Sequence, residues 1–104
     1  MSAVTEADVE RVRALVAAIP PGSVSTYGDL AGAAGLSSPR IVGWIMRTDS
    51  ADLPWHRVIS ASGKPAAHLA HRQLDKLRAE GVPINDGKVA LRECRWDSDP
   101  GYAE

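Results

Sequence analysis

Apolar residues recur at helical spacing in the first part of the chain. Four of them follow at intervals of three, four and three residues, the period of one helix face: Val9, Val12, Val16 and Ile19. Thr5 with Asp8 matches a capping box, and Pro20-Pro21-Gly22 cannot continue a helix. The pattern predicts an opening helix between these signals, followed by a short extended stretch over 23–25.

Two shorter segments carry helix caps and stops. Thr26 precedes a helix predicted over about 27–34 that Gly35 can close. Ser38-Pro39 begins another, over about 39–46, with proline at the first helical position. The size and spacing of the pair are typical of a helix-turn-helix, but any two packed helices would show the same pattern.

The second half of the chain combines short extended runs with one further helix. Residues 55–59 have strand-like composition, and a helix is predicted over about 68–80 with Gly81 as its stop. Asn85-Asp86-Gly87 predicts a turn between two short extended pieces, and residues from about 97 predict a loose acidic tail. These elements predict a mainly α fold.

Length and composition place the chain among ordinary globular proteins. Its 104 residues suit a single domain spanning 1–104, and 44% of them are hydrophobic. No apolar run is long enough to cross a bilayer, and the first residues lack the features of a signal peptide. We therefore expect no membrane partner and a cytoplasmic location, nucleoid-associated in a bacterium or nuclear in a eukaryote.

Charge is unevenly distributed along the chain. The net charge of -1 argues against a protein that coats DNA indiscriminately. Residues 40–80 contain seven Lys or Arg against four Asp or Glu, a balance of +3, and the rest of the chain therefore carries -4. The middle segment could present a basic face to phosphates, although a solvated helix surface would give the same count.

Cysteine and histidine usage argues against a metal or cofactor site. One cysteine, Cys94, excludes an internal disulfide and a zinc site with paired thiolates. His68 and His71 lie three apart on the predicted fourth helix, but no third ligand stands at a suitable spacing. We expect neither metal nor cofactor, and these histidines to contact DNA or solvent.

Three stretches, in this order, carry a family resemblance: IPPGSVSTYG at 19–28, RIVG at 40–43 and PWHRVI at 54–59. From about Val9 to Gly81 the chain resembles the DNA-binding domain of the O6-alkylguanine-DNA alkyltransferases. It resembles still more closely the alkyltransferase-like proteins, in which tryptophan replaces the acceptor cysteine. The resemblance implies a winged helix-turn-helix domain with a short β-hairpin or strand beside the second helix of the pair, the recognition helix.

Trp55 stands where the transferases have their acceptor cysteine in the pattern Pro-Cys-His-Arg. An indole cannot replace a thiolate nucleophile, so the chain is not expected to be an enzyme. The resemblance implies binding of O6-alkylguanine in duplex DNA by nucleotide flipping, which flags the lesion for nucleotide excision repair and blocks alkyltransferase. A sequence-specific helix-turn-helix regulator and an enzyme that uses Cys94 remain alternatives.

The resemblance also implies which residues contact DNA. Tyr27 would crowd a phosphate and help rotate the nucleotide, and Arg40 would fill the space that the flipped base leaves. Gly43 would allow close approach, and Ser38 and Thr26 complete the DNA-binding set. The alternatives are that Tyr27 is a core residue with its hydroxyl at the rim and that Arg40 is a phosphate-binding or surface arginine.

The implied alkylguanine pocket consists of Trp55, Val58, Met46 and Tyr27. Backbone carbonyls of Trp55 and Val58 would accept hydrogen bonds from the guanine amino group. A tryptophan in such a run would otherwise be read as core. The partners implied are double-stranded DNA containing O6-alkylguanine and damage-recognition proteins of excision repair, with the protein itself a monomer.

A polar cluster of His56, Arg57, Asp49 and Glu80 is implied as well. In the transferases the matching cluster activates the thiol. With no thiol at position 55, we expect it to hold the chain together through paired charges and hydrogen bonds. The family usually has asparagine at the position of Asp49, so this carboxylate could pair differently.

Overall fold

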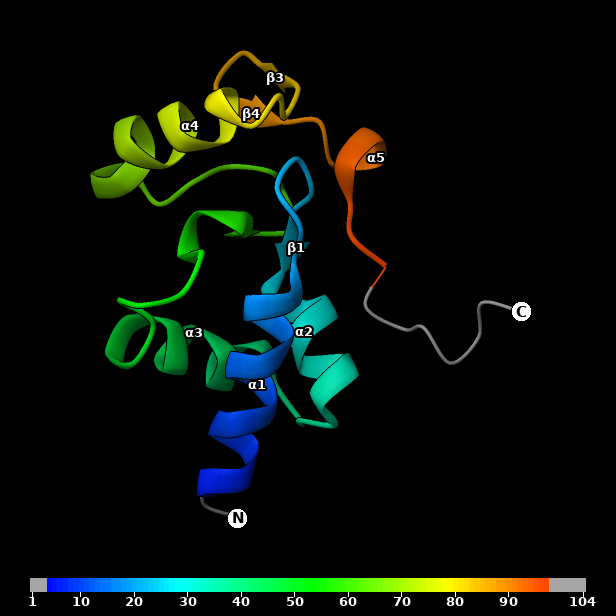
Figure 1. Cartoon of the computed structure of the whole chain (residues 1–104), viewed down its shortest axis with the longest axis vertical. Coiled ribbons are helices and arrows are strands. Elements are labelled where there is room, and N and C mark those ends of the chain that lie inside the picture. Colours follow the sequence, from blue (N-terminus) through cyan, green and yellow to red (C-terminus); the bar gives the residue numbers. More distant parts are fainter. Residues whose placement is uncertain (1–3, 98–104) are drawn as a thin grey trace.

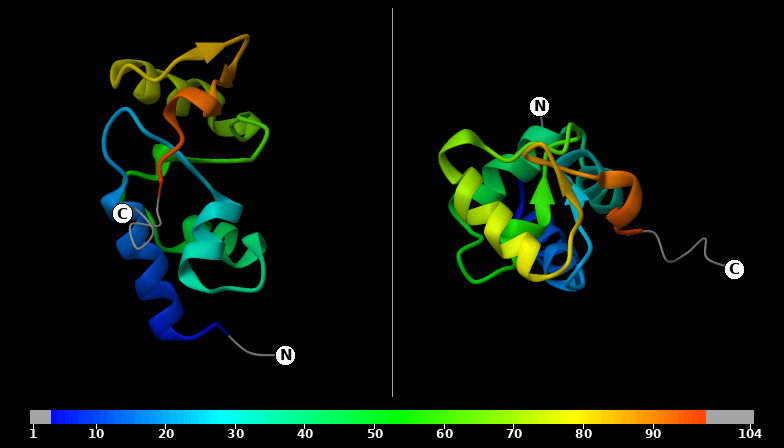
Figure 2. Two further views of the ribbon diagram at one scale, coloured as in Figure 1. Left: turned by 90° about the vertical axis from the view of Figure 1, so that its right-hand side faces the viewer. Right: turned by 90° about the horizontal axis from the view of Figure 1, so that it is seen from above.

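The computed structural model describes residues 4–97, and helices dominate it. Figure 1 shows α1, α2 and α3 in one layer and α4 with the β3–β4 hairpin in a second layer above it. The side view in Figure 2 keeps the same two layers apart. This mainly helical architecture with a short hairpin confirms the predicted fold class.

The first helix, α1 (Glu6–Ala18), begins at the predicted capping box. The backbone N–H of Asp8 donates to Thr5 Oγ1 at 3.1 Å, and the Thr5 N–H donates to Asp8 Oδ2 at 3.0 Å. These two bonds satisfy donors that a helix start leaves open. Val12 and Val16 lie buried on the predicted apolar face, so this expectation is confirmed.

The predicted helix pair is α2 (Tyr27–Ala34) and α3 (Pro39–Thr48). Thr26 Oγ1 accepts from the Asp29 N–H at 3.0 Å, and Gly35 closes α2 with a φ of 73°, the left-handed conformation that glycine adopts readily. Ser38 Oγ accepts from the Arg40 N–H at 3.1 Å. The caps are where the sequence predicts them, and α3 runs two residues beyond the predicted end at Met46.

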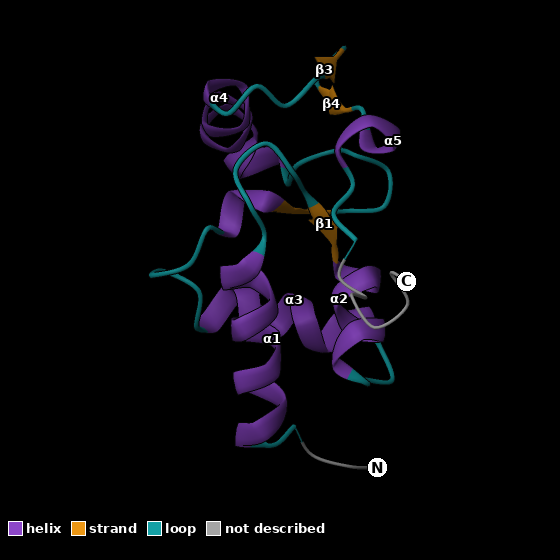
Figure 3. Cartoon of the chain, turned by 45° about the vertical axis from the view of Figure 1, so that its right-hand side comes forward, coloured by secondary structure: helices purple, strands orange, loops and turns teal. Residues whose placement is uncertain are grey.

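A short parallel strand pair joins the two layers, β1 (Ser25–Thr26) beside β2 (Val58–Ile59). The predicted strand over 55–59 is wrong in its first three residues, because Trp55–Arg57 forms a 3-10 turn, η1. Successive side chains of a strand point to opposite faces, whereas the turn lets His56 and Arg57 both reach one carboxylate, that of Glu80. Figure 3 shows β1 between the helical layers.

Helix α4 (Ala70–Ala79) follows a 3-10 turn, η2 (Ala67–Leu69), so the predicted helix over 68–80 is confirmed apart from its ends. The predicted turn is present between β3 (Ile84–Asn85) and β4 (Lys88–Val89), which pair antiparallel. Asp86 and Gly87 take positive φ values of 53° and 74°, as a two-residue hairpin turn requires.

A short hairpin or strand was expected beside α3, and a strand lies there, since Val58 of β2 belongs to the same core cluster as Val42 and Ile45 of α3. The β3–β4 hairpin packs with α4 through Val89 and Leu77 (Figure 1). A short helix that the sequence analysis missed, α5 (Leu91–Cys94), follows it, since four residues are too few to show a periodicity. The tail predicted from about residue 97 lies, from residue 98 on, outside the residues that the structure describes.

Two apolar clusters meet at β2. Val58 belongs to the cluster between α1, α2 and α3, and the adjacent Ile59 belongs to the cluster under α4. Because strand side chains alternate, two residues suffice to face both layers. The strand therefore ties the helix pair to α4. Within residues 4–97 no helix has the length and apolar character needed to cross a membrane.

Candidate nucleic-acid interface

A cleft of about 830 Å³ lies between α3 and the segment from β2 to α4. All four residues of the predicted pocket line it: Tyr27, Met46, Trp55 and Val58. Gly43 lines it as well, whereas Thr26, Ser38 and Arg40 do not. The structure therefore brings the predicted pocket together. Ser38 and Arg40 lie at the exposed start of α3, whereas Thr26 is only 2% exposed before α2, which corrects its predicted direct contact with DNA.

Tyr27 is the first residue of α2 and lines the cleft. Burial raises the pKa of its phenol, an effect that the nearby Arg47 partly offsets. The hydroxyl is therefore neutral and can donate a hydrogen bond. Among residues 4–97 no partner holds that hydroxyl, so it is available to a molecule that enters the cleft.

Arg40 lies on the exposed face of α3, in its first turn. Helix α3 turns Val42 and Ile45 into the core, which leaves Arg40 and Arg47 on the opposite, solvent-facing side. The guanidinium of Arg40 forms no ion pair with any carboxylate of the described chain. It is a free cation next to the cleft.

Trp55 forms one wall of the cleft and is held from two sides. The Arg72 guanidinium carbon lies 5.5 Å from the centre of a Trp55 ring, within the range of a cation–π contact. The His56 ring meets Trp55 edge-on, with ring centres 6.2 Å apart and planes at 87°. These contacts hold the half-buried indole in place as a wall of the cleft, with the Arg72 guanidinium over its ring.

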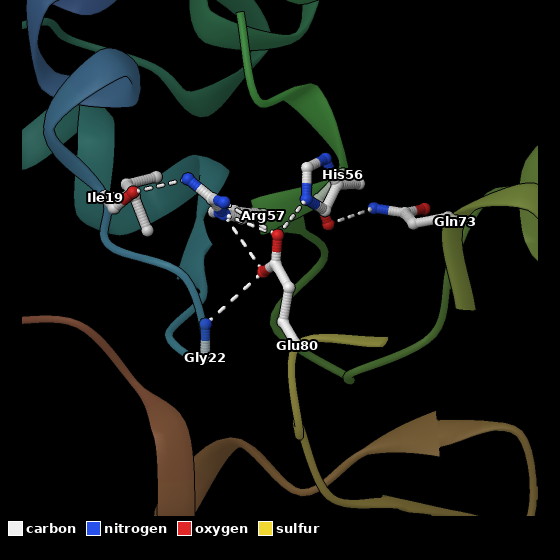
Figure 4. Close-up of polar contacts among 6 residues, drawn as sticks. All are labelled: Ile19, Gly22, His56, Arg57, Gln73 and Glu80. Atoms are coloured by element: carbon white, nitrogen blue, oxygen red, sulfur yellow. Dashed lines mark hydrogen bonds and ion pairs between the residues drawn. The ribbon is translucent and has the colours of Figure 1, made fainter. Parts of the chain in front are cut away.

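Behind this wall, Glu80 gathers a cluster of donors that Figure 4 shows. Arg57 Nη2 donates to Glu80 Oε2 at 2.7 Å and Arg57 Nε to Oε1 at 3.0 Å, a two-pronged contact. His56 Nε2 lies 2.8 Å from the same carboxylate, and the Gly22 N–H donates to it at 3.3 Å. Arg57 also donates to the Ile19 carbonyl at 2.9 Å, so the cluster joins η1, α4 and the end of α1.

The carboxyl of Glu80 is the most strongly perturbed acid in the described part of the chain. Hydrogen bonds from Arg57 lower its pKa from the ordinary 4.5 to about 2, with burial opposing and His56 and Gly22 adding to the effect. Glu80 is therefore charged at every pH at which the protein would work. A charged carboxylate paired with the Arg57 guanidinium is a structural clamp and not a proton donor.

Asp49 does not join this cluster, which corrects the prediction. It caps the end of α3 with its side chain 57% exposed and lies 3.3 Å from Arg13 Nη1 of α1. Arg13 also holds Asp52 at 2.7 Å and thereby ties the loop after α3 to α1. Arg13 Nη1 also donates to the Asp49 carbonyl at 2.7 Å, so one arginine of α1 holds both the backbone and the side chain at the end of α3.

Gln73 is a site residue that the sequence analysis missed. It is buried on α4, and its Nε2 donates to the carbonyls of His56 at 3.0 Å and Val58 at 2.9 Å. The predicted role of the Val58 carbonyl as an acceptor for guanine must therefore use its second lone pair. A polar residue between inward leucines gives no periodic signal, so only its burial reveals it.

The remaining candidates are two histidines and the cysteine, and each has few polar contacts. His68 lines the cleft, and the exposed His71 lies 3.3 Å from Asp75 on its own helix. Cys94 is buried, its Sγ donates to the Ala90 carbonyl at 3.4 Å, and burial raises the pKa of the thiol. Across residues 4–97 no three His, Cys, Asp or Glu side chains are grouped as a metal would require.

Together, the capped pair α2–α3 and the aromatic-walled cleft beside it define a helix-turn-helix-type domain with a pocket. The family model described as 6-O-methylguanine DNA methyltransferase, DNA binding domain, matches residues 8–82. The chain belongs to this family, and the predicted resemblance is confirmed.

Relatives and solved structures agree with this assignment. A DNA base-flipping protein of Vibrio parahaemolyticus is 39% identical over 83% of this chain and 92% of its own length. Alkyltransferase-like protein 1 of Schizosaccharomyces pombe is 38% identical over 78% of this chain and 86% of its own. The crystal structure of S. pombe Atl1 in complex with damaged DNA containing O6-carboxymethylguanine covers 89% of this chain and 97% of its own, with a TM-score of 0.80 and 34% identity.

Proposed function

We propose that this protein binds O6-alkylguanine in duplex DNA by turning the damaged nucleotide into the cleft, and that it transfers no alkyl group. The observation that carries the proposal is the cleft itself. Trp55 and Met46 offer apolar, polarizable walls that suit an alkyl substituent, and α3 with its free Arg40 stands at the edge of the cleft. A structural relative is bound to DNA carrying O6-carboxymethylguanine, which supports the same ligand class here.

No cysteine of the described chain lines the cleft, so the cleft lacks the thiolate that would accept an alkyl group. Trp55 occupies the middle of the Pro54-Trp55-His56 run, and an indole does not displace an alkyl group from oxygen under mild conditions. Cys94 lies in the cluster under α4 and does not line the cleft. Its raised pKa keeps it a thiol, which is the unreactive form.

Arg40 and Tyr27 would have different roles in flipping the nucleotide. Extruding a base costs a few kcal/mol in lost stacking and pairing, and less when the base is already mispaired. The planar guanidinium of Arg40 can stack in the vacated space and donate to the orphaned partner base. Tyr27, at the start of α2, would crowd the phosphate of the same nucleotide and hydrogen-bond with the base in the cleft.

Gly43 supports a close approach of DNA to α3. A Cβ at this position would meet no protein atom within 4 Å, so packing inside the protein does not require glycine. Its place at the cleft edge suggests that the missing side chain makes room for a partner. Ser38 caps α3 and would present its hydroxyl and the nearby N–H groups to a phosphate. Thr26 is only 2% exposed and its hydroxyl accepts from the Asp29 N–H, so its contribution would be to cap the helix that Tyr27 begins.

The consequence of binding would be signalling and shielding. A persistent complex on bent DNA would be read by damage-recognition proteins of nucleotide excision repair, and a covered lesion would be closed to alkyltransferase. The protein would act on double-stranded DNA as a monomer, in the cytoplasm or nucleoid of a bacterium or the nucleus of a eukaryote. The clamp of His56, Arg57 and Glu80 would serve this function by holding the Trp55 wall in place.

Matched duplexes test the proposal. Two DNAs that differ only in guanine against O6-methylguanine are titrated with the protein, and the protein mass is measured afterwards. We expect tighter binding to the lesion with no gain in mass. Equal affinity together with a preference for one unmodified sequence would instead indicate a sequence-reading regulator, and a mass gain of one methyl group would indicate an enzyme.

Trp55→Ala is expected to reduce the preference for bulky alkyl groups more than it reduces binding to undamaged duplex. The substitution removes the wall that faces the substituent but leaves Arg40 and the α3 surface in place. Binding curves for O6-methylguanine, O6-benzylguanine and guanine duplexes give the preference directly. Trp55→Phe is the matched control, since it keeps an aromatic wall. An equal loss on all three duplexes would contradict a pocket role for Trp55.

A further inference from the structure

Trp44 is an exposed tryptophan on α3. Its surface is 47% exposed, the highest of the large hydrophobic residues in the described chain. The helix has a separate apolar face, formed by Val42 and Ile45, that packs into the core. Trp44 therefore contributes little to folding. A single exposed apolar residue is ordinary in a folded protein, so any role for Trp44 has to come from its neighbours on α3.

The surroundings of Trp44 are cationic. Arg40 lies four residues before it and Arg47 three residues after it, so the three side chains share one face of α3. No acidic residue occurs between Pro39 and Thr48. A planar apolar ring between two guanidinium groups matches a partner that alternates anionic groups with flat or apolar surfaces, which is the chemistry of a DNA strand.

Trp44 is also separate from the cleft. Gly43, Met46 and Arg47 line the cleft, whereas Trp44 does not. A DNA strand that reached the cleft along α3 would therefore run over Trp44 next to, and not at, the nucleotide that enters the cleft.

We propose that Trp44 is a lesion-independent DNA contact that packs against sugar rings or base edges adjacent to the flipped nucleotide. This inference rests on the proposed function. In this role Trp44 adds affinity for any duplex, damaged or not, while Trp55 supplies the preference for the lesion. The division explains how a chain with a net charge of -1 could hold DNA long enough to test its bases.

Trp44→Ala and Trp44→Phe are measured against guanine and O6-methylguanine duplexes at one salt concentration. The alanine variant is expected to bind both duplexes about tenfold more weakly, the scale of one lost aromatic contact to a nucleotide, with the ratio of the two affinities unchanged. The phenylalanine variant should keep most of the affinity. Thermal unfolding of both variants should match the parent, because the side chain is exposed.

Three outcomes would overturn the inference. Unchanged binding of the alanine variant to both duplexes would remove Trp44 from the interface. A loss confined to the lesion duplex would assign it to the pocket. A concentration-dependent dimer in sedimentation that the alanine substitution abolishes would make the surface a contact between copies of the chain. Failure of the proposed function is a separate result, since the parent protein would then bind both duplexes equally.

Discussion

Glu80→Gln is expected to lower the free energy of unfolding by about 3 kcal/mol at pH 7. The carboxylate accepts from Arg57, His56 and Gly22, and its pKa of about 2 against an ordinary 4.5 measures how strongly the folded state favours the charged form. Glutamine keeps the size of the side chain and loses the charge. Urea unfolding followed by circular dichroism gives the difference.

The effect should depend on pH in a defined direction. The folded carboxyl has the lower pKa, so as the pH falls the unfolded chain takes up the proton first and stability is lost. The advantage of the parent over Glu80→Gln is expected to be complete above about pH 5 and to shrink between pH 4.5 and pH 2. Comparing the two proteins at each pH cancels the titration of the other carboxyls.

Glu93→Gln is the matched control for this prediction. Glu93 is exposed on α5 and forms no ion pair among the described residues, so its substitution should change stability by less than about 0.5 kcal/mol. A difference between the parent and Glu80→Gln that stays constant from pH 7 to pH 3 would contradict the clamp role of Glu80.

Arg40→Ala is expected to weaken binding to the O6-methylguanine duplex by about 1–3 kcal/mol, the range of a lost interfacial charged contact. The side chain is exposed and unpaired in the described chain, so its removal should leave the fold intact. Fluorescence anisotropy on a labelled duplex measures the loss, and thermal unfolding confirms that both proteins are folded.

Two further variants test whether Arg40 acts through its planar guanidinium group or only through its positive charge. Arg40→Lys keeps the charge but loses the planar group that can stack and donate to an orphaned base, so it should recover only part of the affinity. Arg92→Ala removes an equal charge on α5, away from α3, and should have little effect (Figure 1). Full recovery by lysine, or an equal loss in Arg92→Ala, would reduce Arg40 to a phosphate contact.

The helices were predictable because their signals are local. Thr5, Thr26 and Ser38 each bond a backbone N–H two or three residues away, and Gly35 takes a φ that few other residues tolerate. Such signals need no knowledge of the rest of the fold. They also placed Arg40 in the first turn of α3, which is why its position could be read from the sequence.

The rest of the site depends on contacts between distant segments. The turn at 55–57 forms instead of a strand because His56 and Arg57 both reach Glu80, more than 20 residues away. The partner of Asp49 is Arg13, 36 residues earlier, and nothing near either residue indicates the pair. Gln73 bonds two carbonyls that only the folded chain brings to α4.

Base flipping itself is tested most directly by a fluorescent base analogue placed next to the lesion in the duplex. A duplex is prepared with 2-aminopurine on the 3′ side of O6-methylguanine, since its fluorescence rises when stacking is lost. At saturating protein we expect a clear rise in fluorescence for the lesion duplex, a smaller rise for the matched guanine duplex, and no change in protein mass. A saturated complex with the lesion duplex and no rise in fluorescence would contradict base flipping.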